Sequence, residues 1–285
     1  MLRPSPGGTI AARGSADDRD VFIPIRTIRS RASARGFPVC AIRRLTYARW
    51  LLRRRHGRAR RPVVASIPAG RIAMYAPSLF VETRPEELHR IMREHALGLL
   101  ITHRPAGLEA DHLPFLLDAD RGPHGTLLAH VARANPVWQE VHDGDPVLVV
   151  FRGVQGYISP NWYPSKQEIH RHVPTWNYEV VHAHGRIRVR DDEKFLRGVV
   201  GRLTRTYEAD QADPWRMSDA PADYLAEQLA HIVGIEVELT RVEGKRKLSQ
   251  NRDARDFEST VQALDSRGRK DLAQAMRRAR EQGPA

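Results

Sequence analysis

The sequence predicts a mainly β protein with flanking helices (α+β), built as one antiparallel barrel. Between residues 99 and 242, short runs rich in β-branched and aromatic residues follow one another. Turn residues such as Arg121-Gly122-Pro123 and Asp143-Gly144-Asp145 separate most of these runs. Amphipathic helical segments interrupt the series only at its start and late in the chain. Six or seven such runs in succession favour an antiparallel barrel.

A helix is expected just before the first β run. Thr83 to Glu86 fits a capping box with proline in the first turn, and apolar residues at helical spacing follow as far as Leu97. Gly98 is placed to end this helix. The predicted β runs are Leu99 to His103, His112 to Asp118, Thr126 to Arg133, Val147 to Arg152, Gly156 to Ser159, Tyr178 to Val189 and Ile232 to Val242.

Three more helices are predicted late in the chain from apolar stripes. The stripes are Phe195, Leu196, Val199, Val200, Leu203 and Tyr207, then Tyr224, Leu225, Leu229 and Ile232, and finally Phe257, Val261 and Leu264. The residues from Ser266 onward are polar, so residues 266–285 are expected to form a frayed or disordered C-terminal tail.

Charge is divided unevenly along the chain, whose net charge is +12. Residues 1–73 contain 17 Arg, no Lys and 3 Asp, which leaves 29 basic and 31 acidic side chains in residues 74–285. This division predicts a basic, disordered N-terminal extension over residues 1–73, or a start site assigned too far upstream, before a domain over residues 74–265. A basic arm for nucleic acid or anionic lipid and a targeting sequence are the alternatives.

Cysteine content and apolar run length limit the possible environments. Cys40 is the only cysteine, so no disulfide within the chain stabilises the fold and no zinc site made of several cysteines is possible. Apolar runs such as Pro146 to Phe151 have the length of a strand, far below that of a membrane span. We expect a cytoplasmic protein with no membrane partner.

The segment from Ser159 to Tyr178 concentrates aromatic, proline and hydrogen-bonding residues. Its three prolines restrict the backbone and predict a shaped loop. Rings for stacking, a lysine charge and several hydrogen-bonding groups suit a flat ligand with a charged tail. A proline-rich connection with buried aromatics is the alternative. The candidate ligand contacts are Trp162, Lys166, Thr175, Trp176, Asn177 and Tyr178.

Several motifs, in order, resemble the PaiB-type FMN-binding transcriptional regulators. They are MYAPSLF (Met74 to Phe80), DHLPF (Asp111 to Phe115), HVARANP (His130 to Pro136), YISPNWYPSK followed by VPTWNY (Tyr157 to Tyr178), and GKRKLSQNR (Gly244 to Arg252). The resemblance runs from Met74 to about residue 265. It implies an FMN-binding split barrel, in which the flavin normally lies at a homodimer interface.

Arg133, in HVARANP, is the strongest phosphate candidate. A guanidinium can bind a phosphate through two N–H groups, and Asn135 can add a donor. His130 belongs to the same motif, and strand alternation places it on the other face from Arg133. A surface arginine at a strand end is the ordinary alternative.

Two further motifs supply the remaining candidates. The resemblance places the Leu113-Pro114 backbone beside the isoalloxazine ring, preceded by His112, and Thr102 is a weaker candidate for the same pocket. The GKRKLSQNR loop is expected to close over an anion, from the same chain or from the partner subunit. A solvated charged turn is the alternative for this loop. Its candidates are Lys247, Ser249 and Gln250, with Lys245 and Asn251.

The resemblance implies a homodimeric, repressor-like regulator in which FMN is a ligand or a redox sensor. DNA is an expected partner, although residues 74–285 are nearly neutral, so either the basic arm contributes or the control is indirect. An FMN-dependent oxidoreductase similar to pyridoxamine-phosphate oxidases is the alternative, with His112 and Tyr178 as candidates for proton transfer.

Two histidine pairs leave a weaker alternative open. His170 and His172, and likewise His182 and His184, are two residues apart, so each pair would share one face of a strand. Imidazole is a common metal ligand, and haem-handling relatives of the split barrel make haem conceivable. No carboxylate or cysteine completes a recognisable ligand spacing, so no metal site is assigned.

Overall fold

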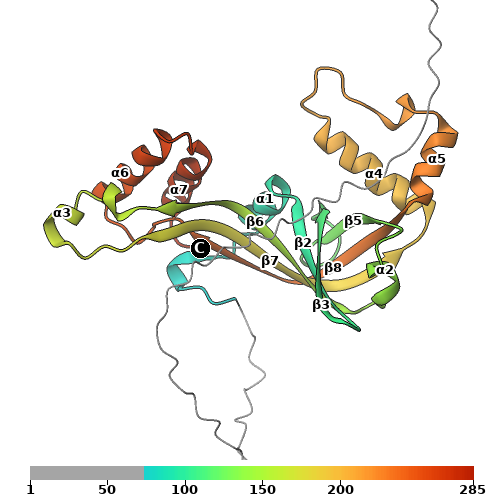
Figure 1. The fold of residues 1–285 in the computed structure, drawn as a ribbon, viewed down its shortest axis with the longest axis horizontal. Coiled ribbons are helices and arrows are strands. Elements are labelled where there is room, and N and C mark those ends of the chain that lie inside the picture. Colours follow the sequence, from blue (N-terminus) through green and yellow to red (C-terminus); the bar gives the residue numbers. More distant parts are fainter. Residues whose placement is uncertain (1–73) are drawn as a thin grey trace, which may run out of the picture. The chain divides into compact units, whose positions relative to one another are not determined.

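The structure, a computed structural model, describes residues 74–285 (Figure 1). The predictions for residues 1–73, including Cys40, lie outside the described residues. An eight-stranded antiparallel sheet has the order β3-β2-β6-β7-β8-β5-β4, and β1 pairs with β8. Helices flank this sheet, so the predicted mainly β fold class is confirmed.

The strands are β1 (Val81–Glu82), β2 (Leu97–Arg104), β3 (Gly107–Pro114), β4 (Leu116–Asp118), β5 (Thr126–Ala132), β6 (Pro146–Ile158), β7 (Thr175–Arg190) and β8 (Ile232–Lys247). The helices are α1 (Pro85–Glu94), α2 (Val137–Glu140), α3 (Lys166–Ile169), α4 (Glu193–Tyr207), α5 (Ala222–Ala230), α6 (Ala254–Asp265) and α7 (Lys270–Gln282), with short 3-10 turns η1 (Ser78–Phe80), η2 (Pro160–Trp162) and η3 (Met217–Asp219). No helix within residues 74–285 is long and apolar enough to cross a bilayer.

The sheet curls around a core but does not close. β3 and β4 end the path of paired strands and do not pair with each other. Apolar side chains from the inner face and from α1 fill the barrel, among them Ile91, Leu100, Phe151, Val181 and Ile235, each with no exposed surface. The fold is therefore an antiparallel split barrel, and burial of this continuous apolar cluster is its main source of stability.

Several strand boundaries differ from the prediction. The run from His112 to Asp118 is divided between β3 and β4, and β3 forms a hairpin with β2. The runs on either side of Gly153 belong to one long strand, β6, whose register against β7 shifts between Arg152 and Gln155. A bulge of this kind interrupts the alternation of side chains, which is why the sequence showed two short runs.

The first helix also differs from the prediction. α1 begins after Arg84, without a side-chain cap, and ends at Glu94, so the predicted capping box at Thr83 is wrong. Gly98 lies inside β2, where a Cβ would meet the side chains of Phe115 and Val149 at 2.9 Å. The glycine is required by close packing and not by a helix end.

The expectation of a frayed tail over residues 266–285 is wrong. α7 buries Leu272, Met276 and Ala279 against α6 and the outer part of β6. These apolar residues recur at helical spacing on one face of α7. The many charged residues between them make the segment polar on average, so its composition did not indicate a packed helix. In Figure 1, α6 and α7 lie beside the long β6–β7 hairpin, whereas α4 and α5 lie at the other end of the sheet.

Candidate functional site

Several of the predicted ligand-contacting side chains gather on the outer face of β7 and β8. Trp176 and Tyr178 alternate with the buried residues of β7, so they share this face. In register, Tyr178 lies opposite Lys247, and Val180 lies opposite Lys245. We call Thr175, Trp176, Tyr178, Lys245 and Lys247 the aromatic–lysine surface.

Neither lysine of this surface forms an ion pair with a carboxylate in residues 74–285. Lys247 Nζ donates to Thr175 Oγ1 at 2.5 Å and to the Trp176 carbonyl at 2.6 Å. Lys245 Nζ donates to the Tyr75 carbonyl at 3.0 Å and lies 5.5 Å from the Tyr178 ring centre. Burial, followed by the positive charges of Arg252 and Lys245, lowers the pKa of Lys247. A bound anion would relieve this excess of positive charge.

Aromatic rings beside the lysines are partly exposed. Trp176 is 55% exposed, and Tyr157 of β6 stands edge-on to it with ring centres 6.4 Å apart. Exposed ring faces next to ammonium and hydroxyl groups match the two halves of FMN, a flat ring system and a phosphate. The residues present at the aromatic–lysine surface therefore fit this cofactor.

Asn177, Ser249 and Gln250 lie behind this surface, on the buried side. Asn177 Nδ2 donates to Ser249 Oγ at 2.9 Å, and Ser249 takes the left-handed conformation with φ 66°. Gln250 Nε2 donates to the Arg246 carbonyl at 2.6 Å. These bonds hold the turn that follows Lys247, so they position the lysine, and direct contact with a ligand stays a prediction.

The other two candidates from the proline-rich segment lie on its loop. Trp162 is half-buried against the cluster formed by α6 and α7, and the Arg267 guanidinium lies 4.9 Å from its ring centre. Lys166 donates to the side chain of Asn161. The contacts described for both residues are therefore within the loop and with the C-terminal helices, and not with the aromatic–lysine surface.

Arg133 lies just after β5, and its guanidinium already has partners. It donates to both carboxylate oxygens of Asp191, at 2.9 and 2.6 Å, and to the carbonyls of Ala230 and Ile232 at 2.7 and 3.1 Å. The hydrogen bond with Arg133 lowers the pKa of Asp191. A phosphate at Arg133 would have to displace this carboxylate, and the phosphate role stays a prediction.

Asn135 and Thr102 are connected through Asp111 of β3. Asn135 Nδ2 donates to Asp111 at 2.8 Å, Arg104 donates to the same carboxylate, and Arg104 Nε donates to Thr102 Oγ1 at 2.9 Å. Next to this chain of bonds, His112, Leu113 and Pro114 complete β3, which is an end strand of the sheet.

β3 therefore has an edge that no other described strand pairs with. This geometry is compatible with backbone bonds from Leu113-Pro114 to a ligand. Nearby on β5, His130 Nδ1 is buried without a hydrogen-bond partner, and burial lowers the pKa of this histidine.

The structure thus brings the predicted residues into two main groups. One group is the aromatic–lysine surface with its supporting turn, and the other surrounds β3 and the end of β5. β2 and β6 separate β3 from β7 within the sheet.

A pocket that the motifs did not indicate lies beside the first half of α4. Its volume is about 320 Å³, and its lining residues are Arg121, Leu128, Arg190, Asp192, Lys194, Phe195, Gly198, Val199 and Arg202. Arg121 pairs with Glu236 at 3.0 Å, and Arg202 pairs with Asp118 at 3.1 Å. These carboxylates offset most of the positive charge, and no motif in the sequence marks the pocket.

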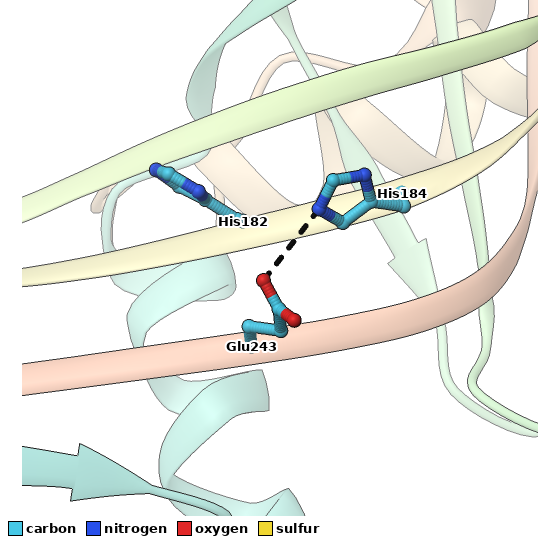
Figure 2. Close-up of side chains that lie close together, drawn as sticks. All are labelled: His182, His184 and Glu243. Atoms are coloured by element: carbon cyan, nitrogen blue, oxygen red, sulfur yellow. Dashed lines mark ion pairs between the residues drawn. The ribbon is translucent and has the colours of Figure 1, made fainter. Parts of the chain in front are cut away.

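The two histidine pairs have different surroundings. His172 has both ring nitrogens engaged, Nε2 with Ser165 at 2.7 Å and Nδ1 with Arg252 at 3.2 Å. His182 and His184 share the outer face of β7, and Glu243 of β8 lies beside them (Figure 2). The sequence singled out both histidines but missed Glu243, because only the β7–β8 register places it there.

Comparisons with known proteins identify the family of this chain. Residues 74–241 match the family described as "Putative FMN-binding domain". The "Protease synthase and sporulation protein PAI 2" of Bacillus subtilis (strain 168) is 29% identical over 193 residues, which cover 68% of this chain and 90% of that protein. An uncharacterized protein of Aspergillus fumigatus is 30% identical over 240 residues, covering 68% of this chain and 92% of the relative.

Solved structures give more distant matches. The flavocytochrome Anf3 from Azotobacter vinelandii has a TM-score of 0.45 at 11% identity, covering 63% of this chain and 75% of that chain. The FAD and heme binding protein from Mycobacterium smegmatis has a TM-score of 0.43 at 18% identity, covering 59% and 73%. The sequence match over residues 74–241 is the stronger finding, and by it the chain belongs to the FMN-binding domain family, with FMN as its cofactor.

Proposed function

We propose that this chain is an FMN-binding regulator that acts as a homodimer and holds the flavin at the aromatic–lysine surface. The observation that carries the proposal is the pairing of exposed rings with two lysines that lack carboxylate partners, in a domain of an FMN-binding family. Trp176 would stack against the ring system, and Lys247 with Thr175 would bind the phosphate. FMN, when bound, supplies one- and two-electron transfer.

An apolar patch on the same outer face supports the homodimer. Leu99 and Ile101 of β2 lie opposite Val150 and Leu148 of β6, and Val180 of β7 continues the patch. All five side chains keep partial exposure, although they lie in the middle of the sheet. A second copy covering this patch would bury them and would bring its own Arg133 and β3 edge towards the flavin.

A regulatory role is supported by the name of the Bacillus relative, which concerns protease synthesis and sporulation. In this proposal the flavin is a ligand or a redox sensor whose state changes the dimer, and DNA is the regulated partner. Because residues 74–285 are nearly neutral, phosphate contacts from this region contribute little to DNA affinity.

The test begins with the absorption spectrum of the purified protein and an FMN titration followed by tryptophan fluorescence. Lys247→Gln is expected to raise the FMN dissociation constant by about ten- to hundred-fold, because a charged hydrogen bond is worth about 1.5–3 kcal/mol. Riboflavin, which lacks the phosphate, should bind both proteins alike.

The exposed Lys270 at the start of α7 provides the matched control, since Lys270→Gln removes the same charge away from the surface. Equal FMN affinity in all three proteins would exclude Lys247 from the site. Steady oxidation of a nicotinamide by the flavin-loaded protein would favour an oxidoreductase over a regulator.

A further inference from the structure

His182, His184 and Glu243 place three metal-ligating groups on one face of two neighbouring strands. The histidines alternate on β7, and Glu243 is the residue of β8 directly opposite His182. One donor atom from each residue lies within 4.8 Å of the other two, and His184 Nε2 is 3.7 Å from Glu243 Oε2 (Figure 2). Donors around a tetrahedral zinc ion are about 3.4 Å apart, given bonds of about 2.1 Å. The largest separation between the three donor atoms, at most 4.8 Å, exceeds this spacing by about 1.4 Å.

The two imidazoles are suited to metal ligation. A neutral imidazole offers the lone pair of one ring nitrogen, Nδ1 or Nε2, to a metal ion. His182 makes no hydrogen bond to any residue in the described part of the chain. Nothing in residues 74–285 therefore competes for its ring nitrogens.

We propose that His182, His184 and Glu243 bind a divalent transition-metal ion such as Zn²⁺ or Fe²⁺. Two imidazoles and one carboxylate are the donor set of several catalytic zinc sites and of non-haem iron sites, whereas Mg²⁺ and Ca²⁺ prefer oxygen donors. Three protein ligands leave positions open for water or a small anion. The His184 side chain is 29% exposed in a single chain, and the site lies beside the apolar patch, because Val150 and Leu148 of β6 are the register partners of His182 and His184.

Arg241 is the group that opposes metal binding at this site. It pairs with Glu243 Oε1 at 3.0 Å, which orients the carboxylate and leaves Oε2 towards the histidines. Its other nitrogen lies 3.0 Å from His184 Nε2, the atom that would bind the metal. The metal must displace this second contact, so removal of the guanidinium is expected to tighten binding.

The site adjoins the aromatic–lysine surface through Lys245, which is two residues from Glu243 on the same face of β8, about 7 Å at 3.3 Å per residue. Tyr178 and His182 are four positions apart on β7, which is about 13 Å at the same rise. Metal binding is therefore measured on the flavin-free protein, so that its outcome can be distinguished from that of the FMN titration.

The experiment uses the full chain without an affinity tag, stripped of metal, and titrated with Zn²⁺ by calorimetry and with Co²⁺ by visible absorption. We expect one ion per chain, and His182→Gln, His184→Gln and Glu243→Gln should each weaken binding by about ten-fold or more. His142→Gln is the matched control, because that side chain is 87% exposed and lies outside the cluster. Thermal melts verify that each variant is folded.

Arg241→Gln provides a second, opposite test. The metal site predicts tighter Zn²⁺ binding in this variant than in the parent chain, and a Co²⁺ absorption band that disappears when Glu243→Gln is added. Unchanged affinity in the three ligand variants, or no saturable binding in either the parent chain or Arg241→Gln, would overturn the proposal and leave the cluster as a hydrogen-bonded support between β7 and β8.

Discussion

Lys247 and Arg133 show that the partners of a charged side chain decide whether it can bind a phosphate. Both are cations in motifs that resemble phosphate-binding segments. Lys247 bonds only to a hydroxyl and a carbonyl among the described residues, so no carboxylate in residues 74–285 neutralises its charge. Arg133 forms a two-pronged pair with Asp191, which satisfies the geometry that a phosphate would otherwise use.

Because Arg133 pairs with Asp191, replacing either residue is expected to change FMN affinity, in opposite directions. If Arg133 binds the flavin phosphate, Arg133→Ala should raise the FMN dissociation constant about ten- to hundred-fold. Asp191→Asn should lower the same constant, because the carboxylate no longer competes for the guanidinium. FMN titrations of both variants measure these effects, with riboflavin as the control ligand. If neither variant changes the FMN dissociation constant, Arg133 has only a structural role, which is to connect the end of β5 with Asp191 and with the residues around the start of β8.

At the scale of residues, the sequence predicted which side chains could contact a ligand better than it predicted which residues they pair with in the fold. Thr175 and Trp176 were candidates in one motif and Lys247 in another, and the structure joins the three by hydrogen bonds. Asp191 is 58 positions from Arg133, and Glu243 faces His182 only through the β7–β8 register. No local spacing rule can find such pairs, because strand pairing alone brings them together.

At the scale of elements, α7 is the main difference from what composition suggests. Leu272 and Met276 have no exposed surface, and with Phe257 and Leu264 of α6 they form a second core against the outer part of β6. This lobe supports the end of the β6–β7 hairpin, next to the strand segment that carries Trp176. The strands were easier to predict, because β-branched runs and turn residues are local signals.

Shortening a buried side chain of α7 is therefore expected to destabilise the protein. Leu272→Ala should reduce the free energy of unfolding by about 2–5 kcal/mol, since a fully buried leucine leaves a cavity. The exposed Gln274 in the same helix provides the control, and Gln274→Ala should change stability by less than about 0.5 kcal/mol. Urea unfolding followed by circular dichroism measures both. Equal stability of the two variants would mean that α7 does not support the fold.

At the scale of the whole domain, a buried network of charges joins the elements. Arg246, which is 2% exposed, pairs with Glu82 of β1 at 3.1 Å, Glu87 of α1 at 3.3 Å and Glu179 of β7 at 2.9 Å. Gln282, at the end of α7, accepts from Arg246 at 2.7 Å. One side chain of β8 thus connects the start and the end of the described chain.

Removal of Arg246 should leave these buried carboxylates with fewer counterions, because Arg84 then remains beside Glu82, and Arg90 beside Glu87 and Glu179. Arg246→Met is expected to cost about 3–5 kcal/mol, although the two side chains have similar volume. Burial raises the pKa of Glu82, but hydrogen bonds from Arg84 and then from Arg246 outweigh it, so the pKa is lowered. That carboxylate stabilises the fold above its unfolded pKa of about 4.5, and the contribution is lost as pH falls through the lower folded value. The parent chain should therefore lose stability in acid, and the variant, which lacks one of the two arginine partners of Glu82, should lose somewhat less, as measured by denaturant titrations across pH.

The uneven charge of the chain predicts that residues 1–73 contribute most of any affinity for DNA. Residues 1–73 carry 17 Arg against 3 Asp, whereas residues 74–285 are nearly balanced. A truncated chain that starts at Met74 should fold, dimerise and bind FMN as the full chain does, and the full chain should bind DNA more tightly. That added affinity should fall steeply with salt and show little sequence preference, because arginines of this kind contact phosphates and not base edges. Anisotropy titrations of both chains at two salt concentrations measure it. Tight, salt-tolerant and sequence-selective binding by the truncated chain would instead mean that residues 74–285 read DNA directly.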